Sequence, residues 1–146
     1  MARRAYFDTS VLVKRYVNER GSILARSLFR RFRVVSCVLF PLEALSTCVR
    51  LKTIGELSER GFSAIMTRIS TDRRQWELVE LNASMLVQAE EVLQRTQLRT
   101  LDALHVACAL IFQGRTSTAV PFVTADERQL QAAQQMGLQV IWVAAT

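Results

Sequence analysis

The sequence has few of the residues that commonly hold transition metals or form disulfides. His105 is its only histidine, and its three cysteines are Cys37, Cys48 and Cys108. The cysteines are odd in number, lack Cys-x-x-Cys spacing and lie in apolar segments, so we expect reduced thiols in the core. Because zinc is usually bound by several cysteines and histidines, the sequence disfavours a zinc site.

Long hydrophobic runs are also missing. The most apolar run, residues 103–112, is too short to span a bilayer, and Asp8 soon after Arg3 and Arg4 is unlike a signal peptide. We therefore expect a cytoplasmic protein with no membrane contact. Its 146 residues, 50% of them hydrophobic, predict a single domain over residues 1–146 with a substantial core.

Lysine is scarce, although the chain is basic. Of its 19 basic residues only Lys14 and Lys52 are lysines, and the formal net charge is +6. The planar fork of arginine binds phosphate oxygens in pairs, and a basic surface attracts nucleic acid by releasing counterions. A nucleic-acid partner is one explanation of this composition, and a high-GC genome that favours arginine codons is another.

The hydrophobic pattern predicts short strands that alternate with helices. The expected strands cover residues 4–7, 34–36, 76–81, 121–124 and 138–143. Four expected helices cover residues 10–16, with Ser10 as the cap, 22–32, 84–95 and 127–136. One more helix begins at Pro41, and another is capped by Ser58. A very apolar helix begins at Leu98, and we expect Gly114 to end it. We expect the two helices on either side of Gly55 to form a hairpin. The alternation implies an α/β fold with a mostly parallel sheet covered on both faces.

Four carboxylates stand out from this pattern. Asp8 ends the first strand, and Asp126 follows Thr124 at the end of another. Asp102 begins the most apolar helix, and Glu43 lies among apolar residues of an earlier helix. Each acid alone has an ordinary structural explanation, either as a helix cap or as an anion in a first helical turn.

Together the four acids indicate a different chemistry. In a parallel sheet they can all converge on one edge, where like charges raise one another's pKa or require a cation. Oxygen-only ligands suit Mg²⁺ or Mn²⁺. Such an ion can activate water and stabilise the charge that grows on a phosphate during displacement.

Four short motifs follow one another along the chain: Tyr6–Leu12, the acidic segment around Glu43, Asp102–Ala107 and Thr124–Asp126. They resemble the motifs of the PIN-domain nucleases and, within that family, those of the small VapC-type toxins of bacterial toxin-antitoxin pairs. Each motif alone is weak. Four in this order, in a chain of this length, are specific, and the resemblance covers the whole chain.

The resemblance implies a three-layer α/β/α sandwich and a Mg²⁺- or Mn²⁺-dependent endoribonuclease. It implies that the metal ligands are Asp8, Glu43, Asp102 and Asp126, and that the Thr124 hydroxyl positions water or phosphate. Transfer or ribosomal RNA is then the expected substrate, a small antitoxin protein the expected partner, and a two-fold homodimer the expected assembly.

Some alternatives stay open at this point. Asp8 could be the nucleophile of an aspartyl phosphotransfer domain, although Ser10 stands where that chemistry usually places a second aspartate. The arginines would also suit a non-catalytic RNA-binding module. His105, three residues after Asp102, is either a hydrogen-bonded core histidine, which we favour, or a residue that orients a metal ligand. Arg99 is either a phosphate contact or, more simply, an exposed turn residue.

Overall fold

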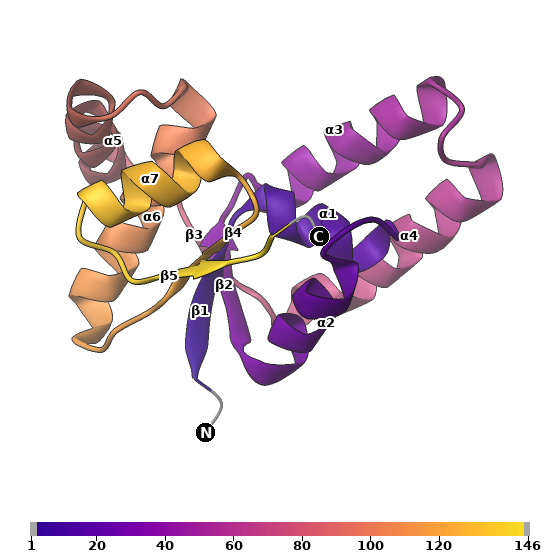
Figure 1. The fold of residues 1–146 in the computed structure, drawn as a ribbon, viewed down its shortest axis with the longest axis horizontal. Helices are drawn as coiled ribbons and strands as arrows, with labels where there is room; N and C mark the ends of the chain where they lie inside the picture. The colour runs from indigo at the N-terminus through magenta and orange to yellow at the C-terminus, as the bar shows by residue number, and fades with distance from the viewer. Residues whose placement is uncertain (1–2, 145–146) are drawn as a thin grey trace.

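A sheet of parallel strands forms the centre of the computed structural model, which describes residues 3–144 (Figure 1). The strand order is β3-β2-β1-β4-β5, and every neighbouring pair is parallel. The strands are β1 (Arg4–Phe7), β2 (Arg33–Cys37), β3 (Glu77–Val79), β4 (Phe122–Thr124) and β5 (Val140–Trp142). The predicted α/β fold with a parallel sheet is confirmed, and β1 lies at its centre.

Helices cover both faces of this sheet. On one face lie α1 (Thr9–Tyr16), α2 (Ser22–Arg31), α3 (Phe40–Thr53) and α4 (Glu59–Asp72), which is followed by the short 3₁₀ turn η1 (Arg73–Gln75). On the other lie α5 (Ala83–Arg95), α6 (Thr100–Thr116) and α7 (Glu127–Gln135). The two groups of helices stand on opposite sides of the sheet in Figure 1. This arrangement is the three-layer sandwich that the resemblance implied.

The alternation of side chains along β1 explains why both faces are covered. Tyr6 packs into the core beneath α5, α6 and α7, where its ring stacks on Phe122 with 5.4 Å between centroids. Phe7 packs into the core beneath α1 to α4 and stacks on Phe29 at 4.4 Å. Because successive strand residues point to opposite faces, this apolar strand is stable only when it is buried on both sides.

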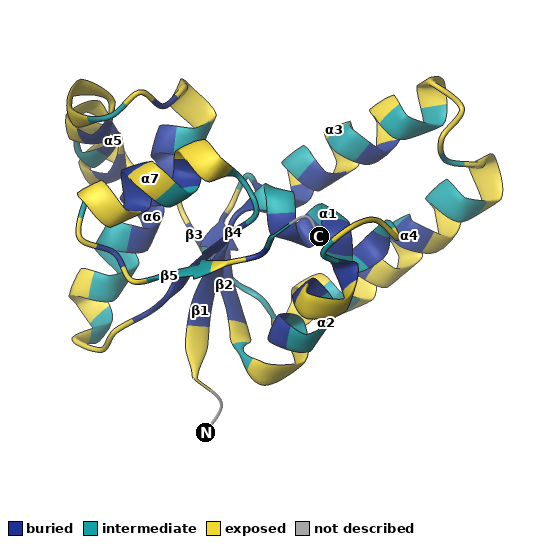
Figure 2. Ribbon diagram, in the orientation of Figure 1, coloured by how far each residue is buried: buried dark blue, intermediate teal, exposed yellow. Residues whose placement is uncertain are grey.

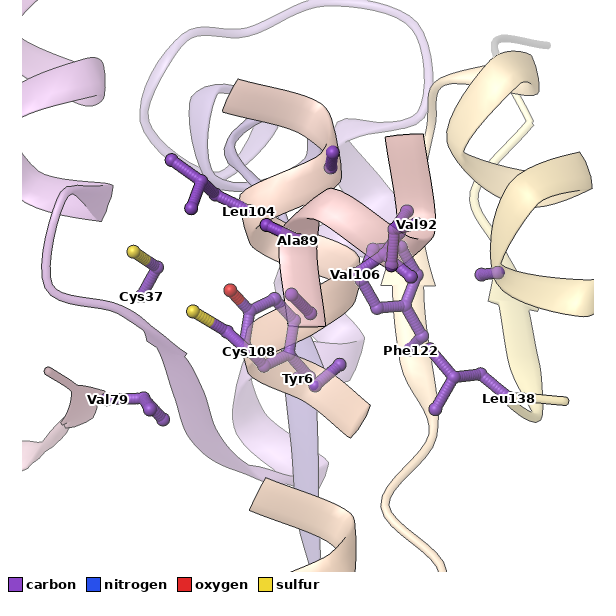
Figure 3. Close-up of a cluster of buried hydrophobic side chains, with 14 of the residues drawn as sticks. Tyr6, Cys37, Val79, Ala89, Val92, Leu104, Val106, Cys108, Phe122 and Leu138 are labelled. Carbon is purple, nitrogen blue, oxygen red and sulfur yellow. The ribbon is translucent and has the colours of Figure 1, made fainter. Parts of the chain in front are cut away.

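Helix α6 contains the longest uninterrupted run of buried residues within residues 3–144. Its residues from Ala103 to Ala109 are all buried (Figure 2), and Figure 3 shows Val106 and Cys108 packed with Tyr6 and Phe122. The prediction that Gly114 ends this helix was wrong, because α6 continues to Thr116. A helical glycine costs about 1 kcal/mol relative to alanine, which packing of the preceding turn readily offsets.

The predicted helix hairpin is present. Helices α3 and α4 pack against each other and extend from the body of the protein in Figure 1. Gly55 has a φ of +82°, in the left-handed region that glycine adopts without strain, and the Ser58 hydroxyl accepts a hydrogen bond from the Gly61 amide at 2.9 Å. Both residues therefore play the roles that the sequence indicated.

Two further expectations concern thiols and membranes. Cys37, Cys48 and Cys108 are free and buried, as predicted. Within residues 3–144, no helix has both the length and the hydropathy needed to cross a lipid bilayer.

Substitution of a buried ring should measure how much the sheet core contributes. Phe122 is fully buried, so Phe122→Ala should lower the free energy of unfolding by about 3–5 kcal/mol through lost burial and a residual cavity. Val87 is 64% exposed, and Val87→Ala should change the free energy of unfolding by no more than about 0.5 kcal/mol. Urea unfolding of both variants measures the two effects, and equal losses would contradict this description of the core.

Candidate active site

Asp8 stands where β1 ends and α1 begins, and its carboxylate is almost completely buried, with 2% of the residue exposed. One oxygen, Oδ1, accepts hydrogen bonds from the Ser10 hydroxyl and from the Val11 amide. The other, Oδ2, accepts a hydrogen bond from the Thr124 hydroxyl. Both oxygens of a buried acid thus have donors from the protein.

The cap of α1 differs from the prediction. Asp8 is the N-cap residue, and Ser10 lies inside the helix. The Ser10 hydroxyl donates to Asp8 and accepts from the Ala125 amide at 3.0 Å, so it ties the loop after β1 to the loop after β4. Asp8 takes the cap because its carboxylate can accept from an amide of the first turn while its backbone is still extended.

Thr124 is fully buried at the end of β4, beside β1 in the sheet. Its hydroxyl donates to Asp8 and accepts from the Asp126 amide at 3.0 Å. It therefore fixes the orientation of the Asp8 carboxylate and shapes the loop that carries Asp126.

Burial raises the pKa of Asp8 from its ordinary value of 3.8 to about 6. The hydrogen bonds from Ser10 and Thr124 and the nearby His105 oppose this effect without cancelling it. An acid with such a pKa at the carboxyl edge of a parallel sheet is a candidate functional group.

Asp102 and Asp126 come from helices on the same side of the sheet. Asp102 lies in the first turn of α6, and its pKa is raised by burial and then by the negative charge of Asp126. Asp126 is the N-cap of α7 and accepts a hydrogen bond from the Arg128 amide at 2.8 Å. It therefore has the role of a helix cap, the ordinary structural explanation considered for it from the sequence. Gln129 donates to Asp102 at 3.4 Å.

Glu43 comes from the opposite side of the sheet, in the first turn of α3. Its carboxylate accepts a hydrogen bond from His105 Nε2 at 2.7 Å, and its charge contributes to the raised pKa of Asp102. The structure therefore brings Glu43 near Asp102 of α6, although α3 and α6 belong to different layers.

His105 is a buried, hydrogen-bonded histidine, as favoured from the sequence, but its partners were not foreseen. Spacing along α6 placed it beside Asp102, whereas its ring bonds to Glu43 and, through Nδ1, to the Tyr6 hydroxyl at 2.8 Å. Burial alone would lower the pKa of His105, but the bond to Glu43 and the charges of Glu43 and Asp8 outweigh burial and raise it.

Sequence reasoning also missed Gln129 as a partner of Asp102 and Tyr6 as a partner of His105. Gln129 is buried, and its Oε1 atom has no hydrogen-bond partner within the described part of the chain. A glutamine three residues after Asp126 gave no local signal, because a polar residue on a short helix is usually exposed. Tyr6 was assigned only to the strand.

The four acids are suitable ligands for a hard cation, but as they stand they do not form a cluster of metal ligands. Among residues 3–144, no three Asp, Glu, His or Cys side chains lie close enough together to form a metal site as they stand. Hydroxyls, an imidazole or helix amides hold Asp8, Glu43 and Asp126. All four offer oxygen donors, and the repulsion that raises the pKa of Asp102 is what a divalent cation would relieve.

Comparison with known protein families identifies a match over most of the chain. The family model described as the PIN domain matches residues 5–135. The chain belongs to the PIN-domain family. PIN domains are generally nucleases, so the family supports a hydrolase that cleaves nucleic acid. Comparison with curated protein sequences found no significant match.

Solved structures show the same fold at low sequence identity. FitAcB from Neisseria gonorrhoeae superposes with a TM-score of 0.70 at 12% identity, covering 94% of this chain and 96% of that one. A toxin-antitoxin complex from Klebsiella pneumoniae gives 0.60 at 13% identity, covering 94% and 95%. VapBC-5 of Mycobacterium tuberculosis, a member of the VapBC family of toxin-antitoxin systems, gives 0.56 at 16% identity, covering 97% and 98%.

The raised pKa of Asp8 makes stability depend on pH. The folded protein holds this proton more tightly than the unfolded chain, so ionisation of Asp8 costs stability as the pH rises from about 4 to above 6. We expect the free energy of unfolding of the wild type, minus that of Asp8→Asn, to fall by about 2–2.5 kcal/mol between pH 4 and pH 7 in EDTA.

Urea unfolding at several pH values measures this difference. Because burial is its main cause, the fall should persist in 0.5 M NaCl, which screens interactions between exposed charges. A difference that stays constant, or that rises with pH, would contradict the assignment of Asp8 as a buried acid with a raised pKa.

Proposed function

We propose that this protein is a metal-dependent endoribonuclease and the toxin of a toxin-antitoxin pair. The observation that carries the proposal is the buried Asp8 at the carboxyl edge of the sheet, close to a set of acids whose charges act on one another. Membership of the PIN-domain family supports it independently.

In this proposal Asp8, Glu43, Asp102 and Asp126 hold Mg²⁺ or Mn²⁺. When bound, such an ion would favour ionisation of a water and neutralise the negative charge that grows on the phosphate. The residues of the chain supply position: Thr124 and Ser10 orient Asp8, and Asp102 and Asp126 approach from the other helical layer. Water adds to phosphorus, and a ribose oxygen leaves with a proton.

The surroundings of Asp8 suit an RNA strand. A hollow of about 370 Å³ adjoins the first turn of α1, and its lining includes Thr9, Ser10, Thr47 and the exposed Arg50. The hydroxyls and the guanidinium that line this hollow can bind ribose and phosphate oxygens. Arg99 is exposed immediately before α6, so its position is explained as that of an exposed turn residue, and we assign it no phosphate contact. Transfer or ribosomal RNA remains the substrate that we propose.

An antitoxin is the proposed protein partner. Leu42 on α3 is 63% exposed next to Glu43, and it lines a groove of about 320 Å³ between α3 and α4 with Val38, Leu45 and Met66. An exposed apolar row of this kind is typical of an interaction surface. The solved complexes of similar fold support this partner. A cytoplasmic location and a two-fold homodimer complete the proposal.

The two alternative functions are less well supported. A nucleophilic Asp8 is disfavoured because Ser10, whose hydroxyl donates to Asp8, stands where aspartyl phosphotransfer usually places a second aspartate. A purely RNA-binding module gives no reason for the charges of Asp126 and Glu43 to act on Asp102.

Cleavage of purified transfer and ribosomal RNAs tests the proposal. The wild type should cut RNA with Mg²⁺ or Mn²⁺ and not with EDTA, and mapping the product ends identifies the site. Asp8→Ala and Asp102→Asn should each abolish cleavage, because each removes a ligand of the ion. Glu90→Gln, which removes an exposed acid on α5, should cleave like the wild type.

The inactive variants must also be shown to fold. Asp102→Asn should cost less than about 2 kcal/mol of stability in EDTA, since it relieves repulsion by Asp126. Wild-type cleavage by either acid variant would overturn the assignment of the site. RNA binding that ignores EDTA, with no cleavage under any condition, would instead identify a binding module.

A further inference from the structure

A buried chain of polar side chains runs from the core of the protein to Glu43. The Tyr6 hydroxyl bonds to His105 Nδ1 at 2.8 Å, and His105 Nε2 bonds to Glu43 Oε1 at 2.7 Å. Tyr6 is fully buried, and 2% of His105 is exposed. Polar groups buried this deeply cost stability unless their partners satisfy them, so the chain of bonds holds each member in place.

The chemistry of the acceptor fixes the position of one proton. A carboxylate can only accept, so Nε2 of His105 must carry the hydrogen that it donates to Glu43. In the neutral ring Nδ1 accepts from the Tyr6 hydroxyl, and in the charged ring Nδ1 donates to the Tyr6 oxygen. The donor to Glu43 is therefore the same in both protonation states of His105.

This bond also connects two layers of the protein. His105 belongs to α6, whereas Glu43 belongs to α3 on the opposite face of the sheet. The bond joins residues 62 positions apart in the sequence, and the charge of His105 also acts on Asp8, which follows the central strand. It sets how far the Glu43 carboxylate stands from Asp102, with which it interacts unfavourably.

We propose that His105 is a positioning residue that aims the Glu43 carboxylate into the metal site, with Tyr6 holding the imidazole in turn. This inference rests on the proposed function. Among the hydrogen bonds of residues 3–144, those to the Glu43 carboxylate use Oε1 alone, which leaves Oε2 able to bind a cation. His105 itself is too deeply buried to contact substrate. A partner that orients a metal ligand in this way typically contributes 10- to 100-fold to metal affinity.

Two amide substitutions of similar polarity separate positioning from core packing. In His105→Gln the amide nitrogen can occupy the place of Nε2 and still donate to Glu43. In His105→Asn the shorter amide can reach Tyr6 but not Glu43. We expect His105→Asn to weaken Mn²⁺ binding about 10- to 100-fold and His105→Gln to stay within about threefold of the wild type.

Titration calorimetry with Mn²⁺ on the full chain measures these affinities, and urea unfolding in EDTA reports the stability of each variant. Tyr6→Phe, which keeps the imidazole and removes the hydrogen bond at Nδ1, should weaken Mn²⁺ binding by less than His105→Asn. In a Glu43→Gln background, His105→Asn should have no further effect on Mn²⁺ affinity, because the carboxylate that it aims is gone.

The outcomes distinguish this inference from the proposed function. If the wild type neither binds Mn²⁺ nor cleaves RNA, the proposed function fails. If the wild type does both and folded His105→Asn binds Mn²⁺ equally well, only the positioning role is overturned. If His105→Asn does not fold, the other variants decide. The positioning role would be overturned if Tyr6→Phe bound Mn²⁺ as tightly as the wild type and His105→Gln lost as much affinity as Glu43→Gln.

Discussion

The buried charge of Asp8 is the constraint on which the site depends. A carboxylate in this position is tolerated only when both oxygens are satisfied, and the donors come from Ser10, Thr124 and an amide of α1. The same two hydroxyls also accept hydrogen bonds from the loop that follows β4. The groups that satisfy Asp8 therefore also fix the position of Asp126. The end of the central strand is thereby joined to its neighbour by side chains as well as by the sheet.

The layered fold supplies acids from two directions. Asp102 and Asp126 begin α6 and α7 on one face, and Glu43 begins α3 on the other. Each lies in the first turn or at the cap of its helix, where the backbone dipole favours an anion. The structure thus lowers the cost of gathering like charges, and the Glu43–His105 bond offsets more of it. A divalent cation is the remaining partner that this charge distribution favours.

The sequence predicted the parts of this arrangement that depend on local pattern. Strand periodicity placed Asp8 at the end of β1, and the apolar run from Ala103 identified α6 as buried. Contacts between distant segments could not be predicted in this way. The spacing rule for helices paired His105 with Asp102, because local geometry contains no information about a glutamate 62 residues away. Gly114 was predicted to end α6 from its low helix propensity, and tertiary packing, which a local pattern does not contain, overrides that propensity.

Diffraction from crystals of the protein soaked in Mn²⁺ tests the central claim most directly, because the anomalous signal locates the ion without any assumption about activity. The account predicts a peak about 2.0–2.3 Å from oxygens of Asp8 and Asp102, with Glu43 or Asp126 completing the set directly or through water. The peak should be absent from crystals of Asp8→Ala. Mn²⁺ bound elsewhere, or no peak beside Asp8 at saturating Mn²⁺, would contradict the account.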